Sequence, residues 1–177
     1  FVSDDYGNRF LVELIQNAHD AHDPSRTDGE IAIVLDASDA THGCLYVANR
    51  GSGFARKNLE AITSIALSSK PVNLGIGNKG IGFRSVLQVC NWPEIYSASA
   101  EASGQFDGYC FRFATLDDFR DYLGPDRYDI AEEMHHTMPC WHVPVPAHPS
   151  DRVEQFARMG FSTVGRLPLK SRDAFAT

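Results

Sequence analysis

The sequence contains no long hydrophobic run: no stretch approaches the roughly 20 apolar residues that a membrane-spanning helix needs. Positive charge is also scarce, with 16 Lys and Arg against 23 Asp and Glu and a formal net charge of −7. A field of that sign repels phosphate backbones, so it disfavours a broad nucleic-acid-binding face while still permitting a local pocket for a small anion. Internal repeats and low-complexity tracts are absent as well. We therefore expect no membrane span and no nucleic-acid partner.

Cysteine is sparse, and no pattern of metal ligands accompanies it. The four cysteines are Cys44, Cys90, Cys110 and Cys140. Because their separations match no zinc or redox spacing, we expect buried free thiols in a reducing compartment, and hence a cytoplasmic protein. Four of the seven histidines lie in a proline-rich stretch: His135, His136, His142 and His148. They lack the i,i+4 pairing of a zinc-hydrolase helix, so a solvated loop is expected there and not a metal site.

The length of 177 residues predicts a single domain over residues 1–177. The sequence begins with Phe1 and not with Met, and it ends just after a strand-like segment, so we expect a fragment of a longer protein. The predicted elements are helices over 8–22, 59–66, 83–90 and 116–122, and strands over 30–36, 44–49, 94–99, 109–114 and 161–169. Strand neighbours with interspersed helices predict the α+β class, as a two-layer sandwich of a mixed β-sheet with helices on one face. The stretch 124–150, with five prolines, is predicted to be a loop-rich insertion.

The first predicted helix carries three polar side chains beside its apolar stripe. Glu13, Asn17 and Asp20 stand at i, i+4 and i+7, within roughly 60° of one another on one helix face. A carboxylate and an amide oxygen one turn apart suit two tasks: one holds Mg²⁺ and the other polarises a water. The alternative is an exposed amphipathic flank that binds nothing.

Two glycine-bearing segments follow this helix. Residues 49–54 (NRGSGF) join a predicted strand to a predicted helix, and glycines there allow close approach of the backbone to a ligand; a plain turn is the alternative. Residues 75–82 (GIGNKGIG) run directly into the next helix, so their N–H groups can form an anion site; a flexible loop is the alternative. This is not a Walker A loop, because Lys79 is followed by Gly80, and no buried strand feeds into it as in a dinucleotide fingerprint.

Together and in this order, the segments ELIQNAHDA, ANRGSGF and GIGNKGIGF resemble the N box, G1 box and G2 box of the GHKL (Bergerat-fold) ATPases. The longer form GNKGIGFRSV followed by NWPEIYSAS is similar to the sacsin and No-Vein-like branch of that superfamily. The resemblance covers about residues 6–99, and the later strand STVGRLPL also fits the branch. It implies the Bergerat ATP-binding fold, with ATP and Mg²⁺ as cofactors.

The resemblance also implies a role for each matching position. Glu13 corresponds to the general base that acts on the attacking water, Asn17 to the Mg²⁺ ligand, and Asp20 to an aspartate close to the nucleotide. Asn49 stands where the family has an aspartate that accepts a hydrogen bond from the adenine amino group. Gly51 and Gly53 would let the backbone pass close to the base, and a mobile ATP lid would cover about residues 68–80. The remaining cofactor-binding positions, in the lid and the G2 box, are Ser69, Lys70, Gly77, Lys79, Gly80 and Gly82.

The function implied by the resemblance is Mg-dependent ATP binding with slow hydrolysis, through in-line attack of water on the γ-phosphate. The domain would act as a conformational switch of a larger protein, with other domains of the same chain and an ATP-dependent dimer as partners. The Asn49 departure leaves open a degenerate nucleotide-sensing or scaffold module without hydrolysis. A protein kinase of the histidine type is a third alternative, ranked last because the sequence shows no phosphoacceptor helix pair.

Overall fold

The computed structural model describes residues 9–25, 27–65, 82–100, 103–138 and 143–172. Its helices are α1 (Arg9–Asp20), α2 (Arg56–Ile65), α3 (Leu116–Leu123), α4 (Tyr128–Thr137) and α5 (Asp151–Arg158), with 3₁₀ helices η1 (Gly82–Gln88) and η2 (Pro125–Arg127). Its strands are β1 (Ile31–Asp36), β2 (Cys44–Asn49), β3 (Glu94–Ser97), β4 (Phe111–Phe113), β5 (Pro144–Pro146) and β6 (Thr163–Pro168). None of the helices within these ranges has the length and apolar character to cross a membrane.

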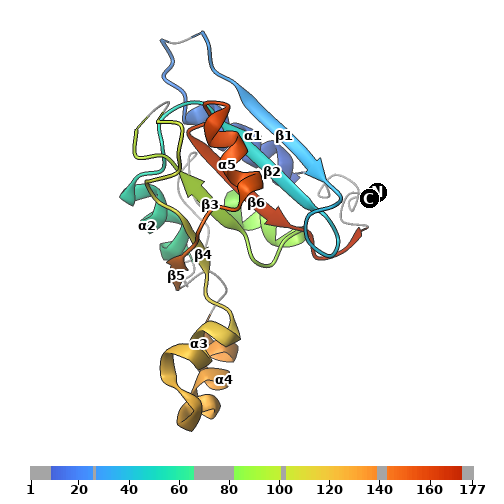
Figure 1. Ribbon diagram of the computed structural model, residues 1–177, viewed down its shortest axis with the longest axis vertical. Coiled ribbons are helices and arrows are strands. Elements are labelled where there is room, and N and C mark those ends of the chain that lie inside the picture. Colours follow the sequence, from blue (N-terminus) through green and yellow to red (C-terminus); the bar gives the residue numbers. More distant parts are fainter. Residues whose placement is uncertain (1–8, 26, 66–81, 101–102, 139–142, 173–177) are drawn as a thin grey trace, which may run out of the picture.

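The six strands form one open sheet in the order β1-β2-β6-β3-β4-β5, which confirms the α+β class (Figure 1). All five strand pairs are antiparallel, so the sheet is not the mixed one that we expected. The difference arises from β6, which comes last in the chain but inserts between β2 and β3. Pairings across such sequence distances leave no trace in local periodicity.

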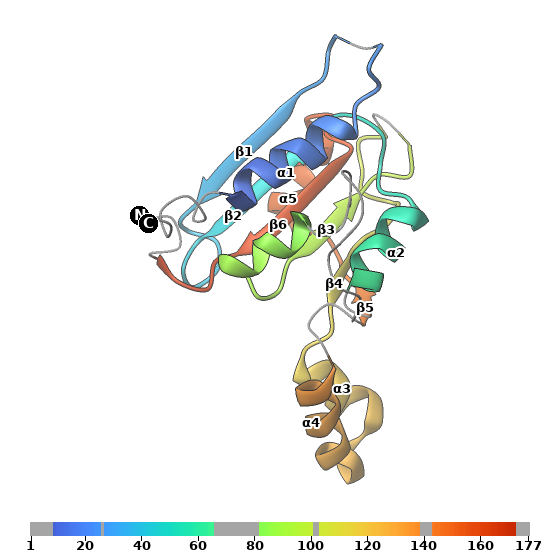
Figure 2. The ribbon, with the colours of Figure 1, turned by 180° about the vertical axis from the view of Figure 1, so that it is seen from behind.

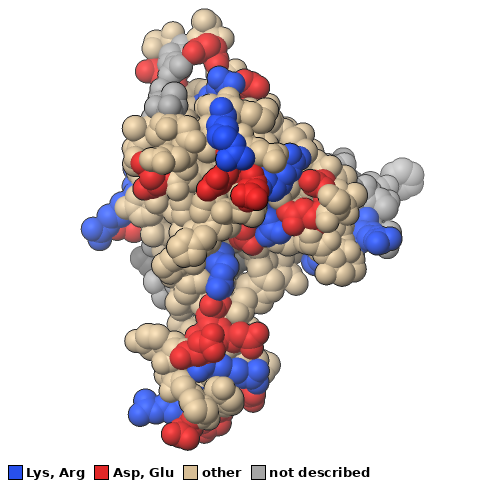
Figure 3. All heavy atoms as spheres, in the orientation of Figure 1, with Lys and Arg blue, Asp and Glu red and all other residues tan. Residues whose placement is uncertain are grey.

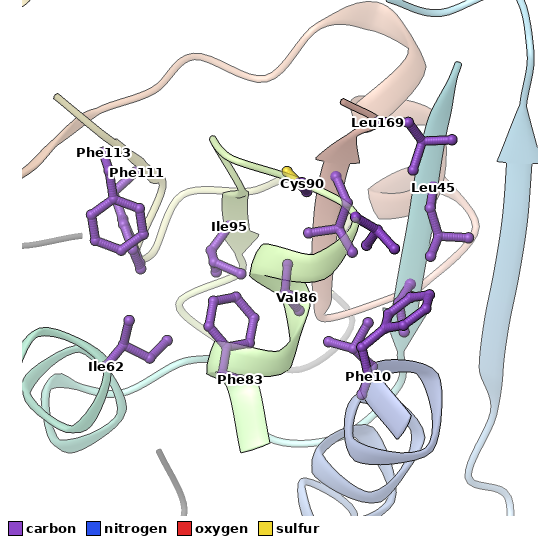
Figure 4. Packing of buried hydrophobic residues seen from close by; sticks show 14 residues of the cluster. Phe10, Leu45, Ile62, Phe83, Val86, Cys90, Ile95, Phe111, Phe113 and Leu169 are labelled. Carbon is purple, nitrogen blue, oxygen red and sulfur yellow. The ribbon is translucent and has the colours of Figure 1, made fainter. Parts of the chain in front are cut away.

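The sheet has a hydrophobic core on each face, because successive strand residues point to opposite sides. On one face, Leu45 and Val47 of β2 join a core that packs against α1, α2 and η1 (Figures 2 and 4). On the other face, Cys44 and Tyr46 pack under α5, where the rings of Tyr46 and Phe156 stack at 5.3 Å. The sheet-and-helix layers are confirmed, but α5 adds a helix on the second face.

The stretch 124–150 is helical over much of its length, where we expected loops. Thr115 caps α3 in a capping box with Asp118, and Gly124 ends it with φ +83°. Pro125 then opens η2, which leads directly into α4. Proline is well suited to the first turn of a helix, so its presence here marks a helix start and not a loop. The α3–α4 pair (residues 116–137) projects from the sheet as an arm (Figure 1).

A polar cluster on the α5 side ties the turn after β1 to the centre of the sheet. The guanidinium of Arg166 in β6 donates to Asp39 (2.8 Å) and to Glu94 in β3 (2.6 Å). The hydrogen bond from Arg166 lowers the pKa of Asp39 from 3.8 to about 2. The ionised carboxylate therefore holds the 37–43 turn against β6.

Candidate functional site

A pocket of about 310 Å³ lies between α1, α2 and the sheet, and we call it the α1–α2 pocket. Its walls are mainly apolar, and polar groups enter from α1, from the end of β2 and from α2. Its lining residues are Leu14, Asn17, Ala18, Asp20, Ala21, Val47, Asn49, Ser52, Gly53, Phe54, Ala55, Lys57, Asn58, Ile62, Phe83, Ile95, Thr163, Gly165 and Leu167. The pocket therefore combines residues from the first two motifs with Phe83, which directly follows the third.

Helix α1 presents one flank to this pocket. Leu14 and Ala18 turn toward the sheet and are buried, while Asn17 and Asp20 lie on the adjacent flank and line the pocket. Both polar side chains are exposed, as groups at the mouth of a pocket are. Glu13 is half-buried one turn before Asn17 and is not among the lining residues of the described chain. The structure thus brings two of the three predicted side chains to the pocket.

Asn49 is the most buried polar residue of the pocket. It is the last residue of β2 and shares the face of Val47, and the residue is only 6% exposed. Among the described residues, its Nδ2 atom has no hydrogen-bond partner. An unsatisfied buried donor costs about 1–3 kcal/mol, so such an atom in a pocket wall suits a ligand that brings an acceptor.

The two glycines of the second motif are required for contacts between backbone segments. A Cβ on Gly51 would lie 2.6 Å from the carbonyl oxygen of Ala21, just after α1. A Cβ on Gly53 would lie 2.3 Å from the carbonyl oxygen of Ala98, just after β3. The same loop is held by the N–H of Ser52, which donates to Ala21 (2.9 Å). These glycines give clearance for the backbone just after α1 and just after β3, and Gly53 also lines the pocket. That they also let the backbone pass close to a base stays a prediction.

Most of the lining residues are absent from the sequence-based set, and three of them bear on what the pocket can bind. Thr163 of β6 lies directly opposite Asn49 in the antiparallel ladder and adds a hydroxyl to the pocket floor. Gly165, two residues further along β6, has no side chain to fill the pocket floor. A Cβ there would make only ordinary van der Waals contacts at 3.8 Å. Lys57 of α2 is exposed at the pocket and is a cation among its lining residues. Thr163 and Gly165 belong to the strand STVGRLPL, which the resemblance already included. No local pattern in the sequence distinguishes Lys57.

Most of the third motif lies outside the described residues. Gly77, Lys79 and Gly80 of this motif lie there, and so does the lid predicted over 68–80 with Ser69 and Lys70. Gly82 is the first residue of η1. We expected a helix over 83–90, and the structure has a seven-residue 3₁₀ helix there, Gly82–Gln88. Phe83 and Val86 anchor this helix in the core beside the pocket (Figure 4).

The cysteines and histidines of the described ranges form no metal site. No group of three His, Cys, Asp or Glu side chains that could hold a metal occurs among the described residues. Cys44 and Cys90 are free and buried, and burial raises the pKa of each thiol to about 12, which keeps them protonated at neutral pH. His135 lies in α4, not in a loop, and stacks on Trp92 at 6.1 Å between ring centroids.

Comparison with known proteins gives one informative similarity. The chain is 31% identical over 119 residues to Protein NO VEIN of Arabidopsis thaliana, and the match covers 67% of this chain. It covers 4% of the much longer Arabidopsis protein, so the two share one small region of that protein. No family model matches the sequence.

Proposed function

We propose that this chain is a GHKL-type ATP-binding domain that binds Mg-ATP, hydrolyses it slowly and acts as a conformational switch of a larger protein. The observation that carries the proposal is the α1–α2 pocket, which combines Asn17 and Asp20 of one motif with Asn49 and Gly53 of another. These motifs are about thirty residues apart in the sequence, and the fold brings polar groups of both to one pocket, as a shared ligand site requires. The similarity to NO VEIN supports the branch to which we assign the domain.

The pocket fits the base and sugar of a nucleotide. Its volume of about 310 Å³ is at the lower end of the range for small-molecule sites. Leu14, Ile62 and Phe83 offer apolar surface for a flat ring, while Asn49 and Thr163 offer hydrogen-bonding groups at the floor. The Nδ2 donor of Asn49 can satisfy the ring nitrogen of an adenine, and its amide oxygen can accept from the adenine amino group.

The α1 side chains are suited to the phosphate end of the ligand. Bound Mg-ATP would supply the transferable phosphoryl group and the metal charge that compensates it. The amide oxygen of Asn17 is a ligand of the kind that Mg²⁺ prefers. A carboxylate oxygen of Glu13, one turn away, would accept the proton of the attacking water.

A nucleotide-sensing module without hydrolysis is the second candidate. It is favoured by the position of Glu13, which is half-buried one turn before Asn17 and is not among the residues that line the pocket in the described chain. If Glu13 cannot reach the water that would attack the γ-phosphate, the domain binds nucleotide but does not hydrolyse it.

Glu13→Ala decides between the two candidates. Nucleotide affinity is measured by calorimetry and phosphate release by a coupled assay, with Gln16→Ala, an exposed neighbour on α1, as the matched control. If Glu13 is the base, the variant keeps the ATP affinity within about twofold and loses at least about a hundredfold in turnover. Turnover that is equal in the two variants contradicts the base assignment, and wild-type binding without turnover supports the sensing module.

A further inference from the structure

Strand β1 is one edge of the sheet, and its outer backbone groups face no other strand of the described chain. It pairs with β2 through six consecutive residues in one register, without a bulge. Residues 31–35 (IAIVL) include no charge, proline or glycine. Natural edge strands are usually protected by such features against pairing with another chain. In β1 the only such feature is the charge of its last residue, Asp36, so residues 31–35 are open to pairing with another strand.

The same edge carries an apolar surface. Ile33 and Leu35 are 42% and 56% exposed, and both point to the α1 side of the sheet. Val12 and Ile15 of α1 are 52% and 37% exposed. Ile15 lies on the flank of α1 that faces away from the α1–α2 pocket, and Val12 lies next to it on the outer surface. We call these four residues the β1–α1 patch; Figure 2 shows α1 running beside β1 on this face.

A cluster of this kind differs from singly scattered surface residues. The described chain has nine exposed large hydrophobic side chains, and four of them form this patch. Exposed apolar residues on two neighbouring elements, beside a strand edge that is unpaired in the described chain, are typical of a protein–protein contact. The patch and the edge are adjacent, so one partner can cover both.

A second copy of this chain fits the edge without opposing like charges. In an antiparallel pair of β1 strands centred on Val34, Ile33 of each copy lies opposite Leu35 of the other. Asp36 then lies opposite Ala32. Centring the pair on Ile33 would instead place Glu30 opposite Asp36, two carboxylates, so the Val34 register is favoured.

The net charge of the chain does not prevent this contact, because most of it lies elsewhere. The α3–α4 arm, residues 116–137, has seven Asp and Glu against two Arg, a formal charge of −5 out of −7 for the whole chain. The arm lies between β4 and β5, at the opposite edge of the sheet from β1. Figure 3 shows acidic side chains gathered on it. Two copies joined through β1 therefore keep their acidic arms far apart.

We propose that two copies of this chain associate through β1, in the register centred on Val34, into one continuous twelve-stranded sheet with the two β1–α1 patches packed together. This goes beyond the nucleotide function: the contact uses no residue of the α1–α2 pocket and forms without nucleotide. An experiment that finds no dimer would therefore not count against ATP binding, and an absence of ATP binding would not count against the dimer.

Sedimentation equilibrium of the nucleotide-free 177-residue chain tests the association. We expect a concentration-dependent dimer, and we expect Ile33→Lys with Leu35→Lys to weaken it at least about tenfold, because four lysines then meet across the strand pair. Tyr122→Lys, on the arm and 89% exposed, is the matched control and should leave the dimer unchanged. Because lysine is common on natural edge strands, the double variant should keep the wild-type circular dichroism. A monomeric wild type, or a dimer that persists in the folded double variant, overturns the proposal.

Disulfide trapping tests the register. In the proposed pair the two Val34 residues are directly opposite, with Cα atoms roughly 4.5–5.5 Å apart, which is within the range of a disulfide. Two Ile33 residues are diagonal neighbours at roughly 7–8 Å, beyond that range. Val34→Cys should therefore give a covalent dimer on mild oxidation, well above the background of the wild type and of Ile33→Cys. Equal trapping at the two positions, or none at Val34, overturns the proposed register.

Discussion

The replacement Asn49→Asp tests the base-recognition role of the α1–α2 pocket with almost no change of shape. In the free protein it exchanges a buried amide for a carboxyl group that is equally buried, at 6% exposure. Burial disfavours a charge, and the cation among the lining residues, Lys57, lies exposed on α2. Because the exchange also removes an unsatisfied Nδ2, we expect a net loss of only about 1–2 kcal/mol in the free energy of unfolding.

Binding of ATP should respond in the opposite direction. A carboxylate accepts from the adenine amino group through a charge-assisted bond about twice as strong as a neutral one. The difference of about 1–1.5 kcal/mol corresponds to roughly tenfold tighter ATP binding. GTP should bind about tenfold more weakly, because its 6-oxo group would face the carboxylate, whereas the amide of Asn49 can donate to it. ATP should therefore also restore the thermal stability that the substitution removes.

Calorimetric titrations with Mg-ATP and Mg-GTP provide the measurement, and Asn58→Asp is the matched control. Asn58 also lines the pocket, and its side-chain oxygen accepts from the N–H of Ala55 at the start of α2. An aspartate preserves that contact, so the control adds the same charge to the same pocket without a base contact. If Asn49→Asp binds ATP no more tightly than wild type, or if it shifts ATP and GTP equally, Asn49 does not read the base.

Three further predictions concern the metal, the glycines and the polar cluster. Asn17→Ala should weaken nucleotide binding in the presence of Mg²⁺ far more than in EDTA, and equal losses in calorimetry would remove the metal role. Gly53→Ala should lower the free energy of unfolding by about 2 kcal/mol or more in urea titrations, because its Cβ would lie 2.3 Å from a backbone carbonyl oxygen. Gly165→Ala, with no contact closer than 3.8 Å, should preserve stability and reduce nucleotide affinity. Since the pKa of Asp39 is about 2 in the folded chain and 3.8 without its partners, its contribution is complete above about pH 4 and is lost as the pH falls toward 2. Asp39→Asn should remove about 2 kcal/mol from the change in the free energy of unfolding between about pH 4 and pH 2, measured by urea titration at each pH. An unchanged pH dependence would show that Arg166 does not stabilise the carboxylate.

Local patterns in the sequence were enough to predict most individual elements. The apolar stripe predicted a helix over 8–22, and α1 is Arg9–Asp20; the strand predicted over 44–49 is β2. Both depend on side-chain periodicity within a few residues, which the sequence displays directly. The same helical spacing placed Asn17 and Asp20 on one flank, where they line the pocket.

Tertiary structure decided everything that depends on residues far apart in the chain. β6 enters the middle of the sheet and places Thr163 opposite Asn49, although more than a hundred residues separate them. The glycines of the second motif are needed because α1 and β3 pass within van der Waals distance of their loop, and a turn signal alone does not show which segments those are. The sequence by itself thus determined the local elements and which side chains share a face. The strand order, the helix on the second face and the pocket arise from burial of apolar surface between distant segments, and that burial is a property of the folded chain as a whole.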